Sequence, residues 1–177
     1  MSRVTEPEGT EPSGTVDAAA DRVREAVPAG SLRHFAALFS GTAERTTIEA
    51  LYAFEAELRR AVTATSHEAA HARLQWWRAE LDRLAAGRPS HPLAQALLPL
   101  RGRREVDLAQ LHEMLVAGDL DLARMTYRSW QELDAYLLRA SGTPQLLIAA
   151  LLAGERGLAP AEREFARRLG AAVRQVE

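Results

Sequence analysis

The stretch AHARLQWWRAELDRLAAG, residues 70–87, carries the clearest structural signal in this sequence. Its apolar residues recur at steps of four and three, which is the period of one face of an α-helix. They are Ala70, Leu74, Trp77, Leu81 and Leu84. Thr65 and Glu68 form a T-x-x-E capping box before the stretch, and Gly87 can end it. The sequence therefore predicts a long amphipathic helix with Trp77 in the core and Trp76 at the margin of the apolar face.

The helical period continues along the chain from Val16, and no segment alternates convincingly as a strand would. Ser129 and Glu132 form a second capping box, and Gly118 can close the helix that precedes it. Pro144 suits the first turn of a buried apolar helix. We expect helices over about 16–26, after Ser31, over 43–62, over 65–87, after Pro92, from Asp107 to Gly118, after Ser129, after Pro144 and from about 161 onward.

Three of these helices carry stripes of large apolar residues that we expect to face the core. In the helix capped by Ser31 the residues are Leu32, Phe35, Leu38 and Phe39. In the helix over 43–62 they are Ile48, Leu51, Leu58 and Val62, with Phe54 at the edge. In the last helix they are Phe165, Leu169, Val173 and Val176.

The composition limits the classes of function. The 177 residues carry a formal net charge of −2, and all 22 basic residues are arginine. The near balance of charge disfavours a nucleic-acid-binding protein, and the absence of lysine excludes Schiff-base and P-loop lysines. The absence of cysteine excludes disulfides and thiolate catalysis and agrees with a reducing compartment. We expect a disordered tail over 1–14 and one helical domain over 15–177.

The N-terminus and the apolar runs indicate a cytoplasmic bacterial protein. Residues 1–15, MSRVTEPEGTEPSGT, are polar and acidic, unlike a signal peptide. The longest apolar run, Leu146 to Gly154, is much shorter than the ~20 residues that span a bilayer. We therefore expect no transmembrane segment.

Two short motifs have the spacing of metal ligands. HEAAH, from His67 to His71, places two histidines at i and i+4, which could bind Zn²⁺ with Glu68 as general base. DAAAD, from Asp17 to Asp21, has a carboxylate spacing that could bind Mg²⁺. However, Glu68 already serves a helix cap, and acidic residues in a first turn complement the helix dipole. We therefore interpret both motifs as solvated helix faces and expect no metal site.

Three segments of the chain resemble the squalene/phytoene synthase family. They are ALYAFEAELRR over 50–60, ARLQWWRAELDRLAAGRPSHPLAQAL over 72–97 and LVAGDLDLARMTYRSWQELDAYLLRASG over 115–142. In the last segment the pattern of the family is occupied by Gly118, Asp121, Leu122, Tyr127, Leu133 and Tyr136. The resemblance covers roughly residues 31–175. Within the family, the chain resembles a divergent branch that includes mitochondrial complex I assembly factors and their bacterial relatives.

The resemblance implies an all-α, isoprenoid-synthase-like helical bundle, here incomplete at the C-terminus. Enzymes of the family join two prenyl diphosphates, and two aspartate-rich motifs on facing helices hold Mg²⁺ against the diphosphates. Where the first motif is implied, this chain has Arg59, Arg60 and Thr63, and the sequence ends before the second. We therefore expect a degenerate member with no catalytic residues and no cofactor, unless the chain is an enzyme that binds Mg²⁺.

Three functional hypotheses follow. The chain is a non-catalytic binding or assembly protein, a prenyltransferase completed by a partner subunit, or a lipid-binding module that keeps the prenyl groove. The candidates for lining a groove or an interface are Tyr52, Trp76, Asp121 and Tyr136. We expect a homo-oligomer or a related protein subunit as the partner, with an isoprenoid or lipid as a candidate ligand and no nucleic acid.

Overall fold

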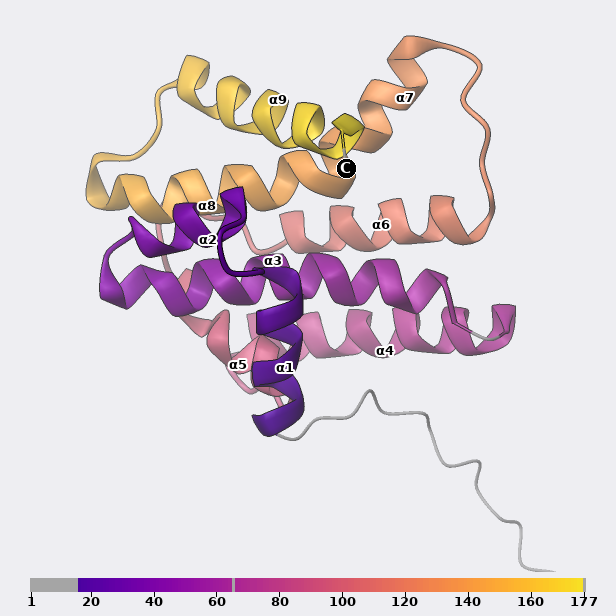
Figure 1. Cartoon of the computed structure of the whole chain (residues 1–177), viewed down its shortest axis with the longest axis horizontal. Coiled ribbons are helices and arrows are strands. Elements are labelled where there is room, and N and C mark those ends of the chain that lie inside the picture. Colours follow the sequence, from indigo (N-terminus) through magenta and orange to yellow (C-terminus); the bar gives the residue numbers. More distant parts are fainter. Residues whose placement is uncertain (1–15, 65, 177) are drawn as a thin grey trace, which may run out of the picture.

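The computed structural model describes residues 16–64 and 66–176, and every regular element within them is helical (Figure 1). The predicted all-α fold class is thus confirmed. The predicted tail over 1–14 lies outside the described residues. The elements are α1 (Val16–Ala26), α2 (Leu32–Leu38), α3 (Thr42–Val62), α4 (His67–Ala85), α5 (Pro92–Ala96), η1 (Leu98–Leu100), α6 (Gln110–Leu122), α7 (Trp130–Leu137), the π-helical turn η2 (Leu138–Gly142), α8 (Thr143–Ala153), η3 (Gly154–Arg156) and α9 (Pro160–Val176).

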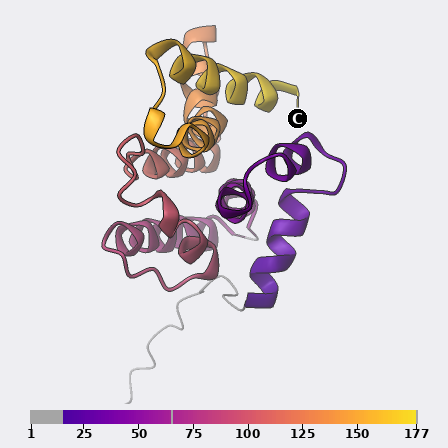
Figure 2. The ribbon, with the colours of Figure 1, turned by 90° about the vertical axis from the view of Figure 1, so that its left-hand side faces the viewer.

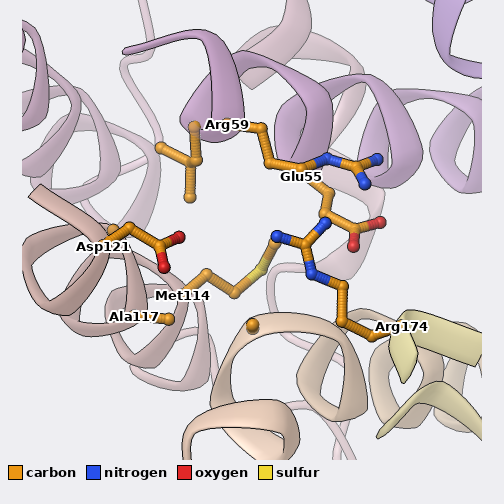
Figure 3. A pocket seen from close by; sticks show the side chains of 9 residues that line it. Glu55, Arg59, Met114, Ala117, Asp121 and Arg174 are labelled. Atoms are coloured by element: carbon orange, nitrogen blue, oxygen red, sulfur yellow. The ribbon is translucent and has the colours of Figure 1, made fainter. Parts of the chain in front are cut away.

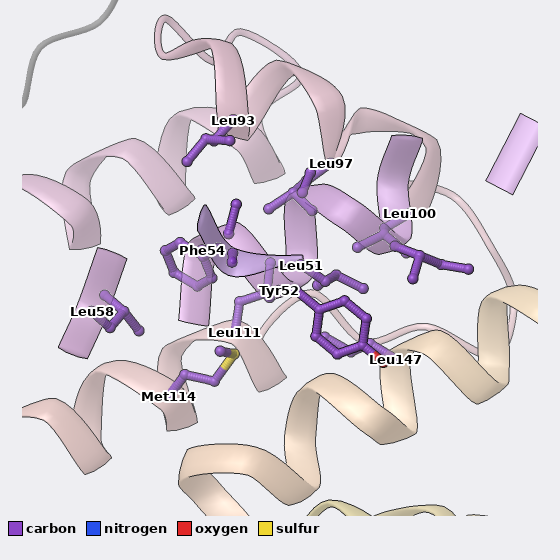
Figure 4. Close-up of a cluster of buried hydrophobic side chains, with 14 of the residues drawn as sticks. Leu51, Tyr52, Phe54, Leu58, Leu93, Leu97, Leu100, Leu111, Met114 and Leu147 are labelled. Atoms are coloured by element: carbon purple, nitrogen blue, oxygen red, sulfur yellow. The ribbon is translucent and has the colours of Figure 1, made fainter. Parts of the chain in front are cut away.

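Helix α3 lies at the centre of the bundle and packs against α1, α2, α4, α5, α6 and α8. Figure 2 views it nearly end-on, with α1 and α2 on one side and α4 on the other. Ile48, Leu51 and Phe54 are fully buried, so Phe54 lies inside the core and not at its edge. Figure 4 shows α3 surrounded by apolar side chains from α6, from α8 and from the segment that holds α5 and η1, among them Leu93, Leu97, Leu100, Leu111, Met114 and Leu147.

Helix α4 contributes the largest buried side chain. Trp77 is 1% exposed, and its ring packs edge-on against the rings of Phe54, at 5.0 Å, and His91, at 4.9 Å. The predicted core role of Trp77 is confirmed. The helix begins one residue later than the predicted capping box, because Ser66 Oγ accepts a hydrogen bond from Ala69 N at 3.1 Å. Thr65 lies outside the described residues.

The predicted inward faces of α2 and α9 are wrong. Leu32 is 82% exposed, Phe39 84% and Phe165 69%, and Phe35, Leu38, Leu169 and Val176 are exposed as well. Val173 is half-buried. Both helices pack on the bundle through small residues instead. Helix α2 buries Ala37, and α9 buries Ala166, Gly170 and Ala171.

Two glycines explain how closely α9 approaches η2. A Cβ atom added to Gly142 would lie 2.9 Å from the carbonyl oxygen of Arg167, and one added to Gly170 would collide with that of Ser141. The backbones therefore meet directly, and the larger residues of α9 are turned away from this contact.

The predicted helix end at Gly118 is also wrong, because α6 continues to Leu122. Gly118 is buried where a Cβ atom would lie 3.1 Å from Leu74 Cδ2.

The predicted cap at Ser129 is confirmed, since Ser129 Oγ accepts a hydrogen bond from Glu132 N at 3.2 Å, while the Glu132 carboxylate accepts from Arg128 N at 2.8 Å and not from Ser129 N. From here α7, η2, α8 and η3 form one helical stretch, Trp130–Arg156. It is the one stretch of the described residues that is long and apolar enough to cross a membrane. In its most apolar window, 56% is buried in the bundle. A helix in the core of a protein can have this length and apolar composition without crossing a membrane. The absence of a transmembrane segment stays a prediction.

The packing of Trp77 gives a first prediction. Trp77→Ala should lower the free energy of unfolding by roughly 3–5 kcal/mol, because it leaves a cavity beside Phe54 and His91. Urea unfolding followed by circular dichroism measures the loss. The matched control is Trp130→Ala, on a largely exposed side chain, which should change stability by less than ~0.5 kcal/mol. Equal effects of the two variants would contradict the assigned packing.

A second prediction concerns pH. Burial lowers the pKa of His91, and nearby Glu80 opposes this only in part. Because the folded state disfavours the charged imidazole, the unfolded chain binds more protons as the pH falls below about 6.5. Stability should therefore decrease by up to about 1.4 kcal/mol per pH unit from pH 6.5 down to the lowered pKa.

The substitution His91→Asn isolates this contribution. His91 Nδ1 accepts a hydrogen bond from Leu93 N at 3.1 Å and caps α5, and asparagine keeps a capping oxygen but does not titrate. Urea unfolding of both proteins between pH 5 and 7.5 should show a flatter pH dependence for the variant. An unchanged slope would assign the titration to another group.

Candidate functional site

Charged residues from α3, α6 and α9 meet in one small cavity. Glu55 and Arg59 come from α3, Asp121 from α6 and Arg174 from α9, and Figure 3 shows Arg174 pointing toward the two carboxylates. The remaining wall is Leu58, Met114, Ala117, Gly118 and Ala140. The cavity volume is about 20 Å³, which is room for about one water molecule. The centre is therefore a closed charged cluster and not an open ligand pocket.

Glu55 is the most deeply buried acid of this cluster. It is 5% exposed, and its Oε1 accepts a hydrogen bond from Ser141 Oγ at 2.6 Å. Its Oε2 lies 3.1 Å from a guanidinium nitrogen of Arg33 on α2. A buried carboxylate without such partners would cost several kcal/mol, so these contacts fix α2 and η2 against α3.

Arg174 is held between a tyrosine and the acids. Burial lowers its pKa, but its hydrogen bond to Tyr136 Oη, at 3.5 Å, and the charges of Glu55 and Asp121 outweigh this and raise the pKa overall. Burial raises the pKa of Tyr136 and raises that of Tyr127 to about 12, where Tyr136 and Asp121 add to the effect. At neutral pH the arginine is charged, and both tyrosines keep their protons.

An open apolar groove lies beside this cluster. Its volume is about 580 Å³, and it runs between α2 on one side and α8 and α9 on the other. Tyr52 and Gln145 supply polar atoms to it, and Gln145 Nε2 donates a hydrogen bond to Tyr52 Oη at 3.1 Å. The remaining lining residues are Ala36, Ile148, Ala149, Leu152, Leu158, Ala161, Glu162, Phe165, Ala166 and Leu169.

The four candidate residues from the sequence fall into three places. Asp121 and Tyr136 meet around Arg174, and Tyr52 lies in the adjacent groove. Trp76 lies elsewhere, half-buried on α4, with its ring 5.6 Å from that of His91. Their roles stay predictions, but the structure brings three of the four to neighbouring sites.

Sequence reasoning did not single out three residues of these sites. Glu55 had a usable signal, because it lies one helical turn after Leu51 on a helix whose apolar stripe predicts burial. A charged residue in such a position needs a buried partner. Arg174 and Gln145 had no local signal, because only the packing of α9 and of α8 in the bundle brings them to α3.

Of the two motifs that we predicted to be solvated, His67, His71 and Asp21 lie on the surface. His67 and His71 are exposed on the first turns of α4, and the described residues contain no group of three side chains that could hold a metal ion. Of the acidic motif, Asp21 pairs with Arg24, and the side chain of Asp17 lies outside the described ones. Neither motif belongs to the charged cluster.

Comparisons with known proteins agree on one family. The family model described as squalene/phytoene synthase matches residues 28–176. Among curated proteins, phytoene synthase of Arthrospira platensis is 32% identical over 79 residues, which cover 45% of this chain and 26% of that protein. The 15-cis-phytoene synthase of Synechocystis sp. is 30% identical over 84 residues, or 48% of this chain and 25% of that protein. The chain thus matches about a quarter of the length of these relatives.

A third prediction follows for the HEAAH motif. His71→Ala should leave the zinc content of the purified protein unchanged and should alter the free energy of unfolding by less than ~0.5 kcal/mol, as expected for an exposed side chain. Metal analysis by mass spectrometry and urea unfolding measure the two quantities. Stoichiometric zinc in the parent protein that disappears in the variant would establish a metal site instead.

Proposed function

We propose that this chain, which belongs to the squalene/phytoene synthase family, is a binding protein of that family and does not itself transfer prenyl groups. Its all-α bundle is accordingly isoprenoid-synthase-like. The proposal concerns the charged cluster of α3, α6 and α9, which includes Arg59, a residue at the place where the resemblance implies the first aspartate-rich motif.

The observation that carries the proposal is the presence of positively charged arginines in the cavity of the charged cluster. Ionisation of an allylic diphosphate requires cations that neutralise the departing group, and Mg²⁺ needs carboxylates with unbalanced negative charge. Here α3 offers Arg59, and α9 brings Arg174 into the same cavity. Glu55 is already bound by Ser141 and by an arginine of α2. These residues do not fit a magnesium–diphosphate site.

The alternative is a prenyltransferase that works on prenyl diphosphates with a partner subunit. It is favoured by the names of the relatives, which are phytoene synthases. In that case the partner supplies the carboxylates, Mg²⁺ is the cofactor, and the lone chain has no activity. The two hypotheses predict different results when a longer family member is added to this chain. Prenyl transfer that requires both proteins is expected under the alternative and not under the binding hypothesis.

The fourth prediction tests catalysis. The purified chain, incubated with geranylgeranyl diphosphate and Mg²⁺, should release no pyrophosphate above the blank, because no described cluster holds the metal. The phytoene synthase of Synechocystis sp., assayed in parallel, is the positive control. Mg²⁺-dependent release by the lone chain that is lost in Asp121→Asn would overturn the proposal. Release only after a second family protein is added would establish the alternative.

A further inference from the structure

Helices α2 and α9 lie side by side and form one apolar face of the bundle (Figure 2). The groove of about 580 Å³ separates them at one end, and a second cavity of about 470 Å³ lies between Leu32 of α2 and Val173 and Val176 of α9. The large side chains exposed on this face are Leu32, Phe35 and Phe39 of α2 and Phe165, Leu169 and Val176 of α9. We call it the α2/α9 face.

The spacing of these residues is that of a seam between packed helices. On each helix they recur at steps of three, four or seven, so they share one side of it. A seam of this kind normally lies against another helix, yet Phe39 is 84% exposed and Val176 86%. Nothing in residues 16–64 and 66–176 therefore covers the α2/α9 face.

We infer that two copies of this chain associate through the α2/α9 face around a two-fold axis. The inference goes beyond the proposed function, because dimer formation neither requires prenyl transfer nor prevents it. Three observations favour a second copy as the occupant of the face, namely its area, its shape and its charges.

The area of the face is close to what a stable dimer needs. At about 150–200 Å² for a fully exposed large apolar side chain, the six side chains together expose roughly 600–800 Å². A standard interface removes about 800 Å² from each partner, and the polar atoms at the border of the face supply the remainder. Apolar patches on monomeric proteins are seldom larger than about 300–600 Å².

The shape of the face allows it to fit a copy of itself, as a two-fold interface requires. The rings of Phe35 and Phe39 stack on α2, with centroids 6.3 Å apart, and form a ridge. The groove lined by Ala36, Phe165 and Leu169 lies beside this ridge. The ridge of each copy can therefore enter the groove of the other, and one rotation makes both contacts.

The charged groups at the border of the face are paired within the chain. Arg33 lies 3.1 Å from Glu55, and Glu162 lies 3.1 Å from Arg156. Around a two-fold axis the like charges of two copies come close, so a face that associates with itself must keep its charges balanced. These pairs meet that condition, and the described residues of the face offer no stripe of one charge that would select an oppositely charged partner.

Sedimentation velocity of the 177-residue chain over a range of micromolar concentrations measures the association. We expect a dimer whose fraction rises with concentration. Leu32→Glu on α2 and Phe165→Glu on α9 should each raise the dissociation constant of the dimer by about a hundredfold or more. The effect is large because a residue of a two-fold interface occurs twice, so each substitution places two charges in the apolar contact.

The matched control is Trp130→Glu. Trp130 begins α7 as Leu32 begins α2, each follows a capping serine, and each is 82% exposed. Because Trp130 lies outside the α2/α9 face, this variant should dimerise like the parent. Thermal unfolding followed by circular dichroism checks that all three variants fold, as expected for substitutions of mostly exposed side chains.

Distances between the two copies locate the interface independently. The chain contains no cysteine, so a spin label on one introduced cysteine gives one label per copy. Ala172→Cys places the label on the exposed side of α9, and Ala79→Cys places it on the exposed side of α4. Pulsed electron paramagnetic resonance should give a shorter distance between labels at Ala172 than between labels at Ala79.

Several results would overturn the inference. They are a monomer at every concentration, a dimer that both face variants leave intact, loss of the dimer in Trp130→Glu alone, and a longer label distance at Ala172 than at Ala79. A chain that stays monomeric alone and associates only with a longer family member would show a heterologous partner instead. Pyrophosphate release by the lone chain would overturn the proposed function and leave the dimer standing.

Discussion

The structure depends on the pairing of two carboxylates that α3 carries into the interior. Glu55 and Glu57 are each 5% exposed, and an unpaired charge at such a depth would cost several kcal/mol. Glu55 binds Arg33 of α2, and Glu57 binds Arg22 of α1 and lies 3.3 Å from Arg60. The helices that precede α3 therefore dock by charge as well as by apolar contact. This explains how α2 can hold its place while it buries little besides an alanine.

The same pairing determines what the centre of the bundle can do. A carboxylate that is neutralised by an arginine of its own chain has little charge left for a metal ion. Arg174 extends this balance to the third helix, because it faces Glu55 and Asp121 and donates to Tyr136. The charged cluster thus places two arginines beside the two carboxylates of α3 and α6 in one cavity, where a magnesium site would need unbalanced negative charge. An open, mostly apolar groove lies beside the cluster.

The features that the sequence predicted were those set by local spacing. The stripe of α4, the burial of Trp77 and the cap at Ser129 all depend on residues within a turn or two. The predictions failed where a distant segment decides which face is covered. Helix α6 continues past Gly118 because that glycine packs on Leu74, which no local pattern reveals. The cluster around Arg174 was missed for the same reason, since even its hydrogen-bond partner Tyr136 lies 38 residues away along the chain.

The wrong faces of α2 and α9 are informative for function. A helix gains stability by burying its largest apolar residues, each contributing about 1.5–3 kcal/mol. Helix α9 forgoes that gain, because it presents Ala166, Gly170 and Ala171 to the bundle and leaves Phe165 largely exposed. Stability within the chain therefore does not explain its large residues. Contiguous exposed apolar surface usually serves binding, and here it forms one wall of a groove that Tyr52 and Gln145 also line. The packing of α9 within the described residues therefore does not account for the apolar character of this face.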